Sequence, residues 1–183
     1  MKNFFLCLLV CLFATGCQTT SLDKATIFYE RATFPDKLQR DTGIINEPIV
    51  QHGRCSLYLG TPSATHTTNF RFCTYALTEQ FLLIQEWDIA NAKYTQFMRI
   101  DFAQLTSVDL ASFIRSKQVK MRETQRLVGI SAIIDEGGYI DGDATERIFQ
   151  AIKAQGIPSV GDDKLLSSPP AAAPAMIIIP RTR

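Results

Sequence analysis

The sequence lacks the marks of several large classes of protein. Its longest apolar run, residues 4–14, is too short for a membrane-spanning helix. The first 16 residues contain one charge, Lys2, and without them Lys and Arg balance Asp and Glu at 18 each, so the basic excess of a nucleic-acid-binding protein is missing. No serine lies in a Gly-x-Ser-x-Gly motif, and there is no glycine-rich phosphate loop. We therefore expect no nucleic-acid partner, no enzyme activity and no cofactor.

The N-terminus has the parts of a signal peptide: Lys2, the apolar run and then small residues. The next four residues, Ala14-Thr15-Gly16-Cys17, resemble the lipobox of bacterial lipoproteins, in which Gly or Ala precedes an obligatory Cys. This resemblance implies that Cys17 carries diacylglycerol and that the chain is cut just before it. The alternative is an ordinary secreted protein. Two or three acyl chains hold a protein firmly at a membrane, whereas one holds it only marginally.

The same resemblance implies a location. Gln18 follows Cys17 at the position where lipoproteins kept in the inner membrane carry Asp, so we expect the chain at the outer membrane, facing the periplasm. Its expected partners are the membrane, through the N-terminal lipid, and a protein of the cell envelope.

Cys55 and Cys73 are the cysteines that remain once the signal peptide is removed and Cys17 is acylated. Their midpoint is Ala64, in a turn-rich stretch, so they can face each other across a hairpin. In an oxidising compartment we expect them to form a disulfide. The alternative is a pair of unpaired buried thiols.

The middle of the chain is dominated by short runs of β-branched and aromatic residues, separated by polar or glycine-containing breaks. Residues 94–101 alternate apolar and polar side chains, as in a strand with one wet face. We expect seven strands, at residues 55–59, 70–77, 81–87, 94–102, 107–113, 119–123 and 127–134.

Two helices are expected. Asp143 and Glu146 have the spacing of a capping box, and apolar residues then repeat at helical spacing until Gly156. A second, short helix is expected at residues 21–34, ended by Pro35.

The sequence thus predicts an α+β, mainly β fold, with about seven antiparallel strands in a roll or small sandwich followed by one C-terminal amphipathic helix. In element order alone, residues 54–156 resemble the pleckstrin-homology-like β-roll, in which the helix plugs one open end of the sheets. The expected organisation is a signal peptide (1–16), a lipid-anchored N-terminal segment (17–53), a β-rich core domain (54–158) and a Pro/Ala-rich flexible tail (159–183).

Residues 115–126 hold five basic residues and one acidic residue. In a strand, Lys120 and Arg122 share one face with Gln118, while Val119 and Met121 turn inward. With Lys117 and Arg126 at the ends, this face could bind an anionic ligand or an acidic partner. The alternative is a solvated strand whose charges block edge-to-edge pairing.

Residues 135–143 hold four carboxylates and three glycines, a composition that suits calcium or acid/base chemistry. Their spacing differs from that of an EF-hand, and Asp143 is expected to cap the helix, so we favour a turn and cap. His52 and His66 lie near the cysteines at irregular spacing, so we expect no metal site.

The C-terminal residues Met176, Ile177, Ile178 and Ile179 form a short β-prone run after the Pro/Ala-rich segment. Such a run can add as a strand to the sheet of a partner or of its own domain, or remain disordered.

The function predicted from sequence is a binding or assembly module of the cell envelope. The alternatives are a hydrolase of envelope polymers that uses Asp135, Glu136 and Asp141, and a carrier of a small ligand with a cavity inside the fold.

Overall fold

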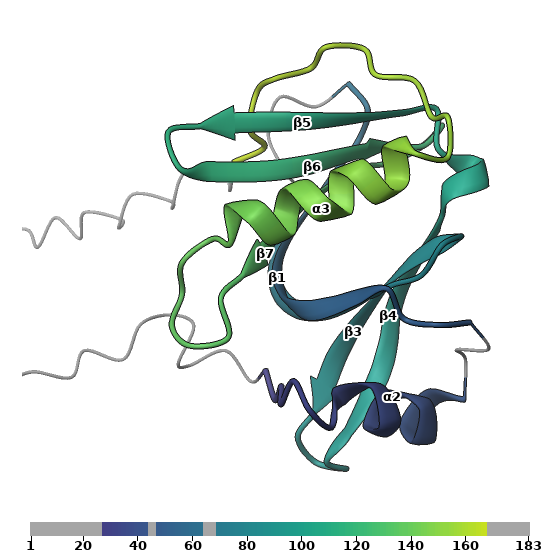
Figure 1. Ribbon diagram of the computed structural model, residues 1–183, viewed down its shortest axis with the longest axis vertical. Helices are drawn as coiled ribbons and strands as arrows, with labels where there is room; N and C mark the ends of the chain where they lie inside the picture. The colour runs from purple at the N-terminus through teal and green to yellow at the C-terminus, as the bar shows by residue number, and fades with distance from the viewer. Residues whose placement is uncertain (1–26, 44–46, 64–68, 168–183) are drawn as a thin grey trace, which may run out of the picture.

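Seven antiparallel strands form one curled sheet with the strand order β4-β3-β2-β1-β7-β6-β5. The computed structural model describes residues 27–43, 47–63 and 69–167. The predicted mainly β fold with a C-terminal helix is therefore confirmed, as one sheet rather than the two of a sandwich (Figure 1). The elements are α2 (Phe34–Thr42), β1 (Gln51–Gly60), β2 (Asn69–Leu77), β3 (Phe81–Asp88), β4 (Lys93–Asp101), the 3-10 helix η1 (Phe102–Gln104), β5 (Ser107–Phe113), β6 (Ser116–Arg122), β7 (Leu127–Ile133) and α3 (Gly142–Lys153).

Each predicted strand is present, and β5 has the predicted bounds. The largest difference is at β1, which begins four residues before the predicted start, at Gln51. These first residues are polar or glycine, so the apolar pattern missed them. Their strand geometry is set instead by pairing with β2, which runs from Gln51 opposite Leu77 to Leu59 opposite Asn69.

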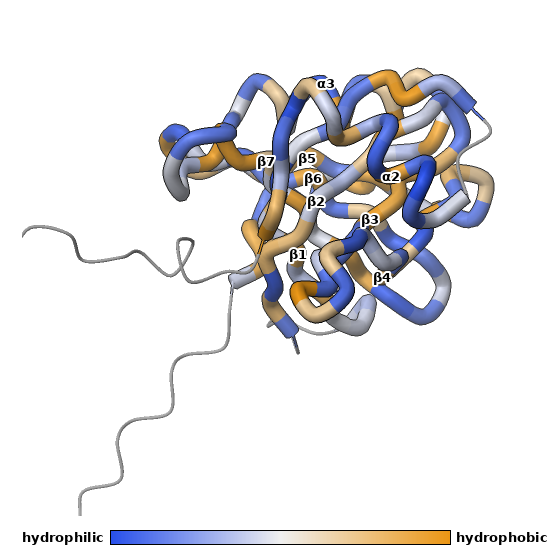
Figure 2. The backbone as a smooth tube through the Cα atoms, turned by 90° about the horizontal axis from the view of Figure 1, so that it is seen from below, coloured by the Kyte–Doolittle hydropathy of each residue, from blue (hydrophilic) through white to orange (hydrophobic). Residues whose placement is uncertain are grey.

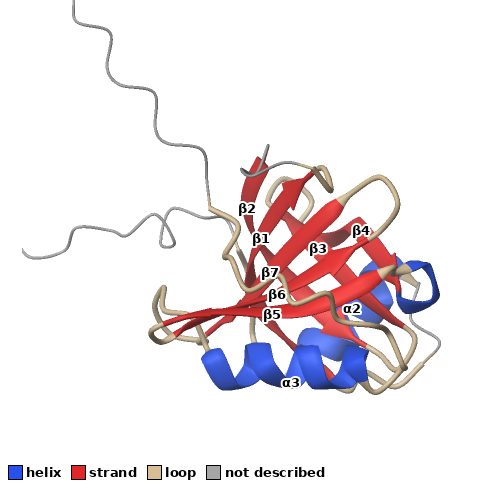
Figure 3. Cartoon of the chain, turned by 90° about the horizontal axis from the view of Figure 1, so that it is seen from above, coloured by secondary structure: helices blue, strands red, loops and turns tan. Residues whose placement is uncertain are grey.

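Strand β1 is the central strand and joins the two halves of the sheet, because it pairs with β2 on one side and β7 on the other. The edge strands β4 and β5 are joined through η1, and α3 lies across the opening between the two halves of the sheet (Figures 1 and 3). Ile148 and Ile152 of α3 are fully buried against the strands. Burial of a side chain of this size stabilises a fold by about 1.5–3 kcal/mol.

The interior core is built from alternate residues of the strands. On β6, Val119 and Met121 point into it, as predicted, while Gln118 and Lys120 lie on the outer face of the sheet. Figure 2 shows hydrophobic residues gathered along the strands in the middle of the molecule. The core is therefore filled by side chains from all seven strands and α3.

Helix α2 packs on the outer side of β4, where Phe34 and Leu38 join a second apolar cluster with Tyr94. The prediction of a helix ended by Pro35 is wrong, because Pro35 lies in the first turn of this helix, which begins at Phe34. Proline lacks the amide N–H that a first-turn residue does not need, so it suits that position. Gly43, with φ of 62°, ends the helix. Of the predicted helix, residues 21–26 lie outside the described residues.

Helix α3 is capped two residues earlier than predicted. The Asp141 carboxylate accepts a hydrogen bond from the Ala144 N–H at 2.8 Å, whereas Asp143 lies in the first turn. Thr145 links this cap to the sheet, since its hydroxyl donates to the Asp141 carbonyl oxygen and accepts from the Ala132 N–H. The hydrogen bond between Ala132 and Thr145 joins the first turn of α3 to β7, with Asp141 at the cap position.

Residues 157–167, here called the strap, run from the end of α3 over the outer face of β5, β6 and β7. Asp109 of β5 accepts hydrogen bonds from the N–H groups of Val160 and Gly161 at 3.0 and 2.9 Å. Further along, the Gln118 side chain bonds both backbone groups of Leu166, which is 7% exposed. The prediction of a flexible tail from residue 159 is therefore wrong for residues 159–167.

Candidate functional site

The predicted basic face is not free in the structure. Lys120 is 3% exposed, and its ammonium group pairs with Asp162 and donates to the Lys164 carbonyl oxygen at 2.9 Å. Arg122 donates to the Pro62 carbonyl oxygen at 2.7 Å and lies 3.4 Å from the same Asp162 carboxylate. The hydrogen bond from Lys120 holds the pKa of Asp162 below its ordinary value.

The other two cations of this face are also paired. Lys117 pairs with Glu146 of α3, and Arg126 pairs with Glu123 and donates to the Arg99 carbonyl oxygen at 3.2 Å. An exposed face for an anionic ligand is therefore a wrong prediction. The window 115–126 contains one acidic residue, and the other countercharges come from α3 and the strap, which the local sequence does not reveal.

Cys55 and Cys73 lie directly opposite each other on β1 and β2, as the midpoint argument predicts. Both are buried, and both are free thiols in the structure. Burial raises the pKa of the Cys73 thiol to about 12 and also raises that of Cys55. As free thiols they would be unreactive core residues. Their register supports the predicted disulfide, which stays a prediction.

Two of the four carboxylates of residues 135–143, those of Asp135 and Asp141, make structural contacts. Asp135 accepts two hydrogen bonds from Arg31, at 2.6 and 2.9 Å, and Asp141 caps α3. His52 lies 3.0 Å from the Tyr29 hydroxyl and stacks on Phe34. Across residues 27–43, 47–63 and 69–167, no group of three or more His, Cys, Asp or Glu residues is placed to hold a metal ion.

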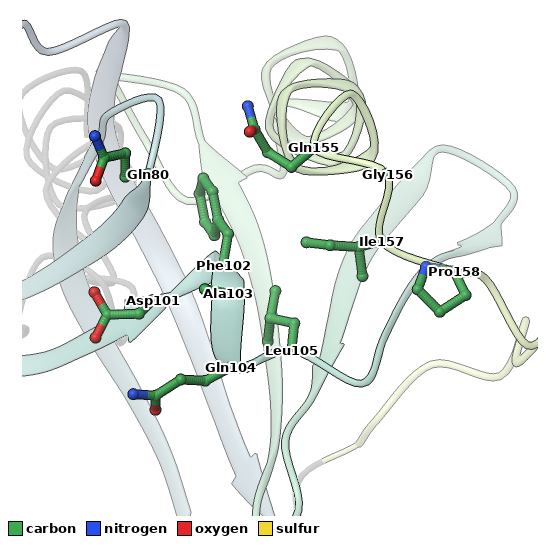
Figure 4. A pocket seen from close by; sticks show the side chains of 10 residues that line it. All are labelled: Gln80, Asp101, Phe102, Ala103, Gln104, Leu105, Gln155, Gly156, Ile157 and Pro158. Carbon is green, nitrogen blue, oxygen red and sulfur yellow. The ribbon is translucent and has the colours of Figure 1, made fainter.

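A cleft, here called the roll cleft, lies where the curled sheet stays open, between η1 and the end of α3 (Figure 4). Its volume is about 650 Å³, within the range of about 300–1,000 Å³ of ligand pockets. Phe102, Leu105 and Ile157 form an apolar floor and are nearly buried. The cleft therefore offers an apolar surface between the two edge strands.

Polar groups line the rim of the roll cleft. The side-chain amides of Gln80, Gln104 and Gln155 are exposed and make no hydrogen bond within the described part of the chain. Asp101, the one charged residue of the lining, already accepts a hydrogen bond from Arg99 at 2.6 Å. Amides both donate and accept hydrogen bonds, so this rim suits a neutral polar ligand.

Sequence reasoning missed the roll cleft because its residues come from three separate connections in the chain: the β2–β3 turn, η1 and the end of α3. The one local signal was the Gly156-Ile157-Pro158 helix stop. Cys17, His66 and the run Met176 to Ile179 lie outside the described residues.

Comparison with known proteins adds no relative: no family model matches the sequence, and a search of curated proteins finds no significant match.

Proposed function

We propose that this chain is an outer-membrane lipoprotein, anchored through Cys17 and facing the periplasm, that acts as a binding or assembly module of the cell envelope. The roll cleft is its binding site, and its ligand is a neutral extended peptide segment of an envelope partner. The predicted run Met176 to Ile179 remains a second candidate contact. Confinement to the membrane surface raises the effective concentration of such a partner.

The roll cleft is the observation that carries the binding role. Its apolar floor can hold side chains while the amides of Gln80, Gln104 and Gln155 bond a peptide backbone. Asp101, the last residue of the edge strand β4, lines the cleft, so an extended segment placed there also lies next to the end of this strand.

The resemblance of Ala14-Thr15-Gly16-Cys17 to a lipobox, directly after an apolar run of signal-peptide length, supports the anchor. In the described residues no helix has the length and hydropathy needed to span a bilayer. The strand order, in which the first and last strands pair in the middle of the sheet, and the helix α3 at the opening support the pleckstrin-homology-like β-roll as the type of fold.

The hydrolase alternative finds little support, because Asp135 is bonded to Arg31 and Asp141 is the cap of α3. A carrier with a cavity inside the fold is likewise not favoured, because the space between the halves of the sheet is filled by Ile148, Ile152 and their neighbours.

Photo-crosslinking in cells tests the binding site. A photoreactive amino acid replaces Gln104 or Gln155 in the full-length lipoprotein, and the matched control carries it at Gln96, an exposed glutamine of β4 outside the cleft. We expect a shared cross-linked partner at Gln104 and Gln155 and none at Gln96.

The cross-linking has two results that would contradict the proposal. Equal labelling at all three positions would show that the roll cleft is not the binding site. Labelling at none of them would contradict a peptide ligand. The mass of the mature N-terminus tests the anchor independently, because an unmodified Cys17 would show that the chain is not acylated.

A further inference from the structure

Three exposed apolar or aromatic side chains lie at the end of the molecule formed by the β5–β6 turn and the loop between β7 and α3. Phe113 is 65% exposed, Ile114 is 88% exposed and Tyr139 is 79% exposed. We call these three residues the tip surface. Side chains of this kind cost free energy in water and mark contact sites when several gather on one surface.

Ile114 is held in an unfavourable backbone conformation. It occupies the β5–β6 turn with φ of 57°, in the left-handed region that glycine or asparagine adopts readily and a β-branched residue rarely adopts. The turn would form more easily without an isoleucine. Its presence at the most exposed point of the hairpin therefore points to a role outside the stability of the fold.

A chain of contacts joins the tip surface to the N-terminal segment. The Arg115 carbonyl oxygen lies beside Gly142, at the start of α3, and the loop that leads to this helix holds Asp135. Asp135 is bonded in turn to Arg31 of the N-terminal segment. Figure 1 shows the β5–β6 turn and the β7–α3 loop projecting on the same side of the molecule.

The position of the anchor follows from covalent geometry. Ile27, the first described residue, is ten residues after Cys17, and ten residues span at most about 36 Å. Phe28 stacks on Trp87 of β3, and Arg31, three residues later, is bound to the loop of Tyr139. An acylated Cys17 therefore lets the tip surface reach the bilayer.

We propose that the tip surface lies in the headgroup region of the phospholipid bilayer that holds the anchor, an inference that rests on the proposed lipidation of Cys17. Aromatic and apolar side chains favour this interfacial region. The exposed charges around them are of both signs, with Arg31 and Arg115 against Glu136 and Asp143, so the surface suits zwitterionic phospholipids. Contact at this end fixes the orientation of the domain and turns the opposite end toward the periplasm.

Depth-dependent fluorescence quenching tests this contact. The full-length acylated protein is reconstituted in phosphatidylethanolamine-rich vesicles with brominated lipid, and an environment-sensitive dye is attached at Ile114→Cys. The matched control is Ile89→Cys, which is 61% exposed in the β3–β4 turn, at the far end of the molecule beside α2. Cys55 and Cys73 are buried and do not compete for the dye.

We expect at least twofold stronger quenching at position 114 than at position 89. Vesicle flotation tests the acyl anchor separately from the contact of the tip surface with the bilayer. If the protein floats with the vesicles but quenching is equal at positions 114 and 89, the tip contact is wrong and the anchor is unaffected. Protein that does not float with the vesicles overturns the anchor and, with it, the tip contact.

Discussion

Gly129 of β7 lies directly beneath Leu166 of the strap. A Cβ atom placed on Gly129 would be 2.9 Å from Leu166 Cδ1 and 3.0 Å from Gln118 Cδ, closer than side chains normally pack. Glycine at this position therefore makes room for the strap on the outer face of the sheet. The strap is therefore an integral part of the domain. Its removal would expose the buried polar side chains of Gln118 and Lys120 on β6.

Substitution Gly129→Ala should displace Leu166 and destabilise the protein by about 1 kcal/mol, the low end of the usual cost of overpacking, because the crowded atoms are the ends of side chains that can shift. Denaturant unfolding measures the change. Leu166→Ala in the same chain should relieve the clash, so the double variant should lose less stability than the sum of the single variants. Gly142→Ala is the matched control, since a Cβ there meets no atom closer than 3.4 Å. Additive losses would contradict the contact.

Asp162→Asn should destabilise the fold by about 1–3 kcal/mol, because it leaves the buried Lys120 charge without its carboxylate. Lys120 would keep its hydrogen bond to the Lys164 carbonyl oxygen, which limits the loss. Thermal or urea unfolding checks this, with Asp163→Asn, a neighbouring exposed position, as the control. Equal stability of the two variants would show that the strap does not depend on this pair.

Asp162 should also make stability depend on pH. Its pKa in the folded protein is lowered, first by the hydrogen bond from Lys120, below the value of about 3.9 of an unfolded aspartate. The contribution is fully present above that value and is lost as pH falls through the folded pKa. The stability difference between wild type and Asp162→Asn should hold at pH 7 and shrink below about pH 4. A difference that stayed constant down to pH 3 would remove Asp162 as the titrating group.

The strands and α3 could be predicted because their information is local. The strands carry short runs of β-branched and aromatic residues, some with a period of two as on β6, and α3 carries a run of apolar residues at helical spacing between a cap and Gly156. The register of β1 and β2 also followed from sequence, because one turn-rich loop fixes the midpoint between Cys55 and Cys73.

The surfaces could not be predicted, because they depend on partners distant in sequence. Lys120 was correctly assigned to the outer side of its strand, but Asp162, 42 residues later, covers it. The same holds for the roll cleft, whose opening is lined by residues as distant in sequence as Gln80 and Gln155. A pattern confined to one strand shows which way a side chain points and not what lies upon it.

Cys55 and Cys73 should form a disulfide in the mature protein of an oxidising compartment. Opposite residues of an antiparallel pair have Cα atoms about 4.5–5.5 Å apart, which is within the range of about 4.4–6.8 Å found for disulfides. Since these two residues are register partners, closure needs little movement of the backbone. Intact mass under non-reducing conditions should be lower by two hydrogens than after reduction. Reduction should then destabilise the fold by about 3 kcal/mol.

The Cys55→Ala/Cys73→Ala variant separates the bond from the rest of the fold. It should unfold like the reduced wild type and should no longer respond to reductant. If instead the native protein has the mass of two thiols, they should resist alkylation until the chain unfolds, because burial raises the pKa of both and leaves little thiolate at neutral pH. That result would contradict the disulfide and make the pair an apolar contact between β1 and β2.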